Sequence, residues 1–257
     1  MSGRWLVHIC WLLVILCLDC SAAWAAEPLP QEIRMVSEHW TGHTNTDGSG
    51  LAWELMRKVF EPAGVCVAAR TVPYTRSVGL VQRGDADAWL GSYRNEITEH
   101  VVYPHTPYDA DRVVALSLGN TPSPTLRDIG RYRLAWMRGY GYQDYLPDVH
   151  HYDEIQRRVG ILRMLELRRA DFYLDASSEV EEVLHEGPDP ALFRITPLIR
   201  LPLYVGFADT PRGHALARLF DQRMAELLRS GGLRPLFKHW RQPYPFDKDM
   251  EIPDASP

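Results

Sequence analysis

Residues 84–90 read GDADAWL and residues 168–174 read RRADFYL, so one short pattern occurs twice, about half the chain apart. Each copy stands at the expected end of an amphipathic helix and at the start of an apolar strand. A helix-to-strand junction that recurs in this way predicts two similar α/β halves. Two halves leave a cleft between them, and a cleft of this kind is where a small molecule binds.

The amino-terminal 25 residues have the three parts of a secretory signal peptide. These parts are Arg4, an apolar run over residues 5–18, and the cleavage-site sequence AWA at residues 23–25. The run is shorter than the roughly 20 apolar residues that span a bilayer. We therefore expect residues 1–25 to be removed and the mature chain to be soluble outside the cytoplasm. A lipid anchor on Cys20 is the alternative, although Asp19 stands where such a motif has a small residue.

The composition of the chain excludes some other classes. Of the four cysteines, only Cys66 follows the expected signal peptide, so the mature chain has no internal disulfide and must rely on its apolar core. The formal net charge is -5, without a dense stripe of Lys and Arg. This charge argues against nucleic acid as a partner.

The first half alternates between strand and helix patterns. Residues 33–36 and 65–72 have strand patterns, and residues 51–59 between them have an apolar helical face. A second helix begins at residues 73–75 and ends at Gly84. The order strand, helix, strand, helix, strand predicts a mostly parallel sheet with helices packed on it.

The second half repeats this alternation after the turn-forming residues 119–124. We expect a strand at 132–137, a helix whose apolar positions run from 155 to 165, and strands at 171–174 and 203–208. The last of these strands would return the chain to the first half, where two further helices follow.

These patterns divide the chain into five parts. We expect a signal peptide at 1–25, the first part of lobe one at 26–117, lobe two at 118–203, a return to lobe one at 204–240, and a flexible tail at 241–257. The tail is rich in Pro and acidic residues.

Four short motifs occur in an order that resembles a known family. They are TVPYTR at 71–76, RGDAD at 83–87, YPHTPY at 103–108 and RADFYLD at 169–175. In this order they resemble the type II periplasmic solute-binding proteins, in particular family 3, the polar amino-acid binding proteins of ABC transporters. The resemblance covers roughly residues 32–240.

The resemblance implies a fold and a role. The fold is α/β, with two lobes that each contain a mostly parallel sheet flanked by helices, joined by two crossover strands. The role is that of a monomeric periplasmic protein that closes its lobes on a small-molecule ligand, amino-acid-like or related, and presents it to an inner-membrane permease or sensor.

The resemblance also implies ligand contacts. In such proteins an Arg of lobe one and backbone N–H groups of lobe two hold the ligand carboxylate, and an Asp of lobe two holds its ammonium. Asp175 matches that Asp; the alternative is that it caps the following helix. The usual Thr-x-x-Arg is missing, since residues 93–100 read YRNEITEH. Arg76 and Arg94 are the remaining candidates for an anion contact, and the alternative for each is an exposed surface position. The missing Arg argues against an ordinary α-amino acid as the ligand.

Aromatic residues at the expected loop tips supply further candidates. Their rings can stack on a flat or cationic ligand, or can simply fill the core, as we expect of Trp53. The ring-bearing candidates for the ligand site are Trp40, Tyr74, Tyr93 and Tyr140.

The sequence contains no motif for catalysis or for a metal. The histidines lack the paired spacing of a zinc site, and no nucleophile elbow or phosphate loop occurs. We therefore expect no catalytic residue, metal or cofactor, and the leading interpretation is a solute receptor. Two alternatives remain: an exported enzyme on the same scaffold, resembling cyclohexadienyl dehydratase, and a sensory module whose cleft has degenerated.

Overall fold

The structure is a computed structural model that describes residues 29–247. The expected signal peptide lies outside the described residues. Within them, no helix is long and apolar enough to cross a membrane.

Nine strands form one hydrogen-bonded sheet in the order β2-β1-β3-β9-β5-β8-β6-β7, with β4 paired to β9. The strands are β1 (Glu32–Ser37), β2 (Cys66–Thr71), β3 (Ala88–Ser92), β4 (Val101–Val102), β5 (Asp109–Leu118), β6 (Leu134–Met137), β7 (Tyr152–Ile155), β8 (Phe172–Ala176) and β9 (Phe193–Ala208). The α-helices are α2 (Leu51–Phe60), α3 (Tyr74–Gln82), α4 (Ile161–Glu166), α5 (Ser177–His185), α6 (Pro211–Arg229) and α7 (Arg234–His239).

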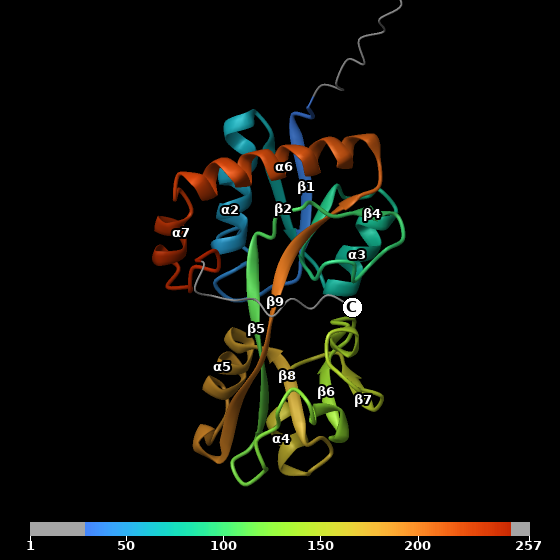
Figure 1. Cartoon of the computed structure of the whole chain (residues 1–257), viewed down its shortest axis with the longest axis vertical. Helices are drawn as coiled ribbons and strands as arrows, with labels where there is room; N and C mark the ends of the chain where they lie inside the picture. Colours follow the sequence, from blue (N-terminus) through green and yellow to red (C-terminus); the bar gives the residue numbers. More distant parts are fainter. Residues whose placement is uncertain (1–28, 248–257) are drawn as a thin grey trace, which may run out of the picture.

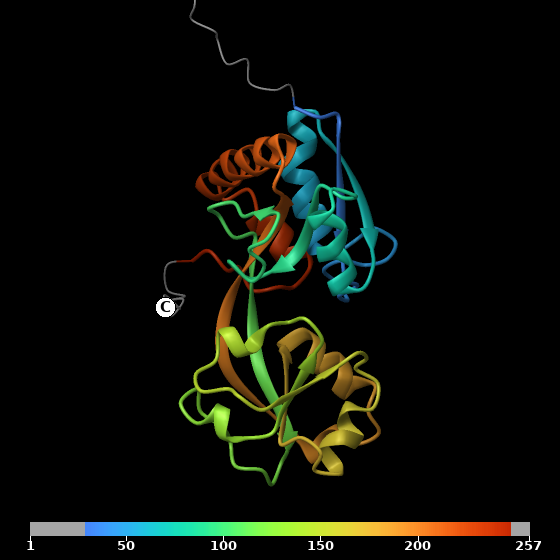
Figure 2. The same ribbon diagram turned by 90° about the vertical axis from the view of Figure 1, so that its right-hand side faces the viewer.

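The elements are gathered into two lobes (Figure 1). Lobe one contains β1 to β4 with α2, α3, α6 and α7, and lobe two contains β6 to β8 with α4 and α5. Within residues 29–247, the long strands β5 and β9 run between the two lobes, as the side view shows (Figure 2). These two strands pair antiparallel from Asp109↔Leu203 to Leu118↔Phe193. The strands β1, β2 and β3 are parallel in one lobe, and β6, β7 and β8 are parallel in the other. The predicted fold class is confirmed; the lobe boundaries expected near residues 117 and 203 stay predictions, because both strands continue through the junction.

The repeated sequence pattern has the same structural role in each lobe. Asp87, just before β3, accepts hydrogen bonds from the backbone N–H of Arg34 at 2.8 Å and from its guanidinium at 3.0 Å. Asp171, just before β8, accepts the equivalent bonds from Arg133 at 2.9 Å and 2.7 Å. Each Asp thus ties the start of one strand to its parallel neighbour. Lobe one adds Arg212 of α6, whose Nε lies 2.9 Å from Asp87 Oδ1.

Two details differ from the sequence expectations. Ile155, expected as the first apolar position of a helix, instead ends β7, which pairs parallel with β6, and α4 begins only after Gly160, whose φ is 93°. The tail expected to be flexible from residue 241 is packed as far as Asp247. Tyr244 and Phe246 lie against Phe237 with ring centroids 5.4 Å and 6.1 Å away.

Candidate functional site

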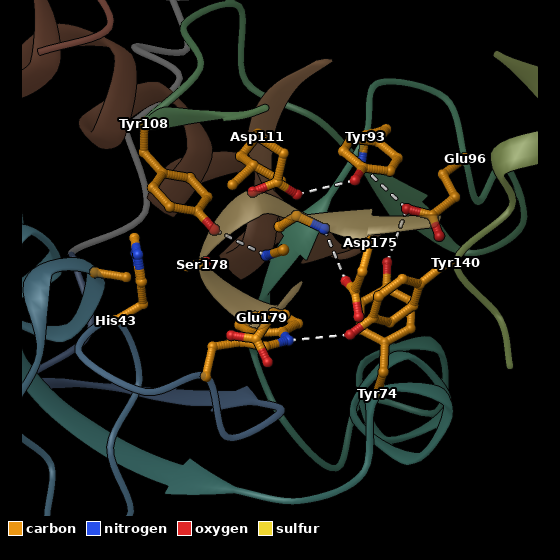
Figure 3. A pocket seen from close by; sticks show the side chains of 15 residues that line it. His43, Tyr74, Tyr93, Glu96, Tyr108, Asp111, Tyr140, Asp175, Ser178 and Glu179 are labelled. Carbon is orange, nitrogen blue, oxygen red and sulfur yellow. Dashed lines mark hydrogen bonds between the residues drawn. The ribbon is translucent and has the colours of Figure 1, made fainter. Parts of the chain in front are cut away.

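A cavity lies where the two lobes meet the linking strands (Figure 3). It encloses about 560 Å³ of space free of protein atoms, part of which is open to solvent. Its lining comes from both lobes and from β5 and β9: Trp40, His43, Ala52, Tyr74, Gly91, Tyr93, Glu96, Tyr108, Asp111, Tyr140, Asp175, Ala176, Ser178, Glu179 and Leu203.

Five of the seven expected site residues line this cavity. They are Trp40, Tyr74, Tyr93, Tyr140 and Asp175. Their contact with a ligand stays a prediction, but the structure brings all five together from segments far apart in the chain.

The two expected anion contacts do not line the cavity. Arg76 is exposed on α3, whose buried face is formed by Tyr74, Ser77 and Val78. The Arg94 side chain is also exposed, and its guanidinium lies 5.5 Å from the ring centroid of Tyr204. Both residues therefore have the surface position that was the alternative reading of the sequence.

Aromatic rings from both lobes meet at the cavity. Tyr74, at the start of α3, has its ring centroid 6.3 Å from that of Trp40 and 5.7 Å from that of Tyr140 in an edge-on arrangement. Trp40 Nε1 donates a hydrogen bond of 3.1 Å to the Tyr140 hydroxyl. Trp40 and Tyr74 belong to lobe one and Tyr140 to lobe two. These three rings therefore form one wall of the cavity only when the two lobes are together.

The Glu96 side chain is held at the cavity by hydrogen bonds from neighbouring residues of its own segment of the chain and from α3. Its Oε2 accepts hydrogen bonds from the hydroxyls of Tyr74 at 2.7 Å and Ser92 at 3.0 Å and from the backbone N–H of Tyr93 at 3.0 Å. Its Oε1 is buried and has no hydrogen-bond partner among the described residues. Desolvation raises the pKa of Glu96 to about 7, although the three hydrogen bonds act in the opposite direction.

A second carboxyl group reaches the cavity from a linking strand. Asp111 of β5 accepts a hydrogen bond of 2.9 Å from the Tyr93 hydroxyl. Desolvation raises the pKa of Asp111 to about 7. Tyr93 lies between the carboxyl groups of Asp111 and Glu96 (Figure 3).

Asp175, at the end of β8, is fully buried and already paired. Its Oδ2 accepts hydrogen bonds from Arg158 Nε at 2.8 Å and from the Tyr173 hydroxyl, and its Oδ1 accepts one from the Ala176 N–H at 2.8 Å. The following helix α5 has no side-chain cap. Helix capping, the alternative role considered for Asp175, is therefore not what the structure shows.

Arg158, which contacts three residues of the cavity lining, is one of the site residues that the sequence analysis missed, together with Glu96, Asp111 and Glu179. Its Nη2 donates to the Tyr140 hydroxyl at 2.8 Å, and its Nη1 lies 3.3 Å from Glu179 and 3.9 Å from Glu38. The expected helix placed Arg158 in a regular element, whereas it lies in the turn between β7 and α4. The run RRVG at 157–160, in which a Gly closes a pair of arginines, is the signal that could have identified this turn.

His43 lines the same cavity and faces Asp109. Its Nδ1 lies 3.9 Å from Asp109 Oδ2, yet desolvation lowers the pKa of His43 to about 4 and raises that of Asp109 to about 8. Both side chains are therefore largely uncharged at pH 7, and their contact is polar rather than ionic. Among residues 29–247, no group of His, Cys, Asp and Glu is arranged to hold a metal ion.

Comparisons with known proteins place this geometry in a wider setting. No protein-family model matches the sequence. The search of curated proteins found no match either.

Solved structures with the same fold are numerous. An ancestral arginine-binding protein bound to arginine has a TM-score of 0.66 and 13% identity, over 83% of this chain and 99% of its own. A substrate-binding protein of an ABC uptake transporter from Streptococcus pneumoniae, with bound histidine, has a TM-score of 0.62 and 16% identity, over 82% and 92%. A histidine kinase sensor domain with similarity to periplasmic binding proteins has a TM-score of 0.64 and 14% identity, over 82% and 96%. At these identities the likeness is one of fold.

Proposed function

We propose that this chain, which has the two-lobe fold of the periplasmic binding proteins, is a solute-binding protein that captures a small polar or amphipathic molecule between its lobes. The observation that carries the proposal is the cavity at the junction, since its lining comes from both lobes and from the strands that link them. A molecule held there touches both lobes, so its binding favours the closed arrangement.

The contacts across the junction suit a clamp. Besides the Trp40–Tyr140 hydrogen bond, Thr41 Oγ1 donates to Glu182 Oε1 at 2.9 Å, and the Tyr145 hydroxyl donates to the Arg94 carbonyl at 3.2 Å. The buried hydroxyls of Tyr93 and Tyr142, 3.4 Å apart, add a further contact between the lobes, while the backbone connection consists of two strands. A hinge in β5 and β9 can therefore open the cleft when these contacts separate.

The proposal includes location and partners. We expect the mature chain to be a monomer in the periplasm and to present its ligand to an inner-membrane permease or to a sensor. Both partners are consistent with the fold, which occurs in transporter binding proteins and in a histidine kinase sensor domain.

The proposal also states that the ligand is bound and not converted. Asp175, the most buried carboxylate of the lining, is saturated by Arg158, Tyr173 and its neighbouring N–H, which leaves it no position for transferring a proton to a ligand. A dehydratase-like enzyme on this scaffold would instead consume the molecule that stabilises it.

A thermal-shift screen of residues 26–257 tests the proposal. The screen covers amino acids, amines, organic acids and small aromatic metabolites, and each hit is followed by calorimetry and by NMR of the recovered compound. A ligand at a hundredfold over its Kd should add about 2.7 kcal/mol to the free energy of unfolding.

The site is tested with one variant pair. Asp111→Asn should weaken the hit, whereas Asp189→Asn, in an exposed loop of lobe two, should leave it unchanged. A hit that is chemically altered on recovery would contradict binding without conversion, and an absence of hits in every class would contradict the receptor role.

A further inference from the structure

We propose that the cleft selects a small organic cation without a carboxylate, meaning an amine or a guanidine, over the α-amino acid of the same side chain. This inference rests on the proposed function, because it concerns the ligand of the same cleft.

The charges around the cavity carry the first step. Four carboxyl groups line it: Glu96 from lobe one, Asp111 from β5, and Asp175 and Glu179 from lobe two. None of its lining residues is a Lys or an Arg. The only lining base is His43, and desolvation disfavours its charged form. A cation in this cavity would therefore meet acidic groups from three parts of the fold, and an anion would meet no Lys or Arg among the described lining residues.

Arg158, whose guanidinium contacts the lining residues Asp175, Tyr140 and Glu179, is fully engaged. Its Nε bonds Asp175, its Nη2 bonds the Tyr140 hydroxyl, and its Nη1 faces Glu179. A ligand carboxylate could reach this guanidinium only by displacing Asp175 or Glu179, which would leave a buried carboxylate unpaired. The protein's own carboxylates thus already pair with this guanidinium.

Glu96 supplies an independent indication of a donor-bearing ligand. One of its oxygens is saturated by three hydrogen bonds, whereas Oε1 is buried and accepts none among the described residues. Buried polar atoms are seldom left unpaired in a folded protein. A cationic ligand with an N–H group would donate a hydrogen bond to Glu96 Oε1 and would also balance the charge of the Glu96 carboxylate.

The aromatic lining suits the body of such a ligand. Trp40, Tyr74 and Tyr140 bring rings to the cavity from both lobes, with Tyr93 and Tyr108 beside them. Ring faces attract ammonium and guanidinium groups within about 6 Å. The protein already uses this contact, since the Arg158 guanidinium lies 6.0 Å from the Tyr140 ring centroid.

Matched pairs of compounds test the inference by titration calorimetry at pH 7.5. Each pair differs by a carboxylate: agmatine and L-arginine, histamine and L-histidine, cadaverine and L-lysine. We expect at least one cation to bind, and to bind at least about tenfold more tightly than its carboxylate-bearing partner, a difference of about 1.4 kcal/mol.

Charge-neutral variants identify the groups responsible. Gln at position 96 keeps an acceptor for the Tyr74 hydroxyl and the Tyr93 N–H but has no charge, so Glu96→Gln should fold and should bind the cation about tenfold more weakly. Asp111→Asn should act in the same direction. Glu99→Gln is the matched control, since Glu99 is exposed three residues away, and it should bind as the unaltered protein does. Thermal unfolding of each variant separates lost binding from lost folding.

The outcomes distinguish this inference from the proposed function. If an amino acid or an organic acid binds more tightly than the amines, the ligand class is wrong while the solute-binding role stands. If none of the cations binds but a neutral solute does, the ligand class is again wrong while the solute-binding role stands. If no compound of any class binds, the proposed function itself fails.

Discussion

Arg158 Nε lies 2.8 Å from Asp175 Oδ2, so a guanidinium of the protein occupies the place that the sequence resemblance assigned to a ligand ammonium. Only 1% of the Asp175 side chain is exposed, against 19% of that of Arg158. The pair belongs to lobe two, and Arg158 also contacts Tyr140, which meets Trp40 of lobe one. The same guanidinium therefore neutralises a buried acid and supports the wall at which the lobes meet.

Arg158→Met should lower the free energy of unfolding by about 3 kcal/mol at pH 7, because it leaves Asp175 and Glu179 buried without their cation. The loss should be smaller at pH 5, where an unpaired buried carboxylate takes up a proton more readily. Urea denaturation at both pH values measures it. Arg163→Met, which breaks an exposed pair with Glu166, is the control and should cost less than about 1 kcal/mol. Equal losses in the two variants would contradict a structural role for the Arg158 pair.

Gly91→Ala should displace Trp40 from the cavity. A Cβ added at Gly91 would lie 2.1 Å from Trp40 Cη2, and the φ of Gly91 is 89°. We expect a loss of about 2 to 3 kcal/mol in stability and a marked loss of ligand affinity, measured by denaturation and calorimetry. Gly64→Ala is the matched control, because its φ is 80° with nothing within 4 Å of an added Cβ, so it should cost only about 1 kcal/mol and leave binding intact.

The melting temperature of the unliganded protein should fall between pH 6.5 and pH 8. A buried acid whose pKa is raised in the folded protein contributes stability that is fully present below its pKa in the unfolded chain. This stability is lost as the pH rises through the folded pKa, which is about 7 for Glu96 and Asp111 and about 8 for Asp109. The lowered pKa of His43, about 4, has the opposite sign, but it acts only below about pH 6.5, its unfolded value.

A calorimetric scan over this pH window tests the sign. Asp109→Asn should flatten the dependence, since Asn can still accept the Ala110 N–H bond that Asp109 Oδ1 accepts at 2.8 Å. A melting temperature that stays level or rises across the window would contradict the raised pKa values, since carboxyl groups with ordinary pKa values contribute no fall there.

The two strand-joining aspartates should differ in their contribution to stability. The Asp87 side chain is 5% exposed and is held by Arg34 and Arg212, whereas Asp171 is 27% exposed and is paired to the exposed Arg133. Asp87→Asn should therefore cost about 2 kcal/mol. Asp171→Asn should cost less than about 1 kcal/mol. Urea denaturation of both variants gives the comparison, and a larger loss for Asp171→Asn would contradict it.

The sequence by itself predicted the elements whose signals are local. The alternation of strand and helix patterns, the repeated Asp before β3 and β8, and the aromatic residues at the strand and helix ends all lie within short segments. Trp40, Tyr74, Tyr93 and Tyr140 could be proposed because residues at the ends of parallel strands and at helix starts gather at one edge of a sheet. Trp53 was expected in the core and is fully buried there.

Only the tertiary structure decided which charges meet in the cleft. Arg76 and Arg94 were plausible by position along the chain, but each side chain points to solvent from its own turn or helix face. Arg158 follows β7, which pairs with β6, while β6 pairs with β8, so its contact with Asp175 depends on a strand order that no local periodicity reveals. Local patterns specify elements, whereas the partners of a charged side chain depend on strand order and on desolvation, which arise only when distant segments pack together.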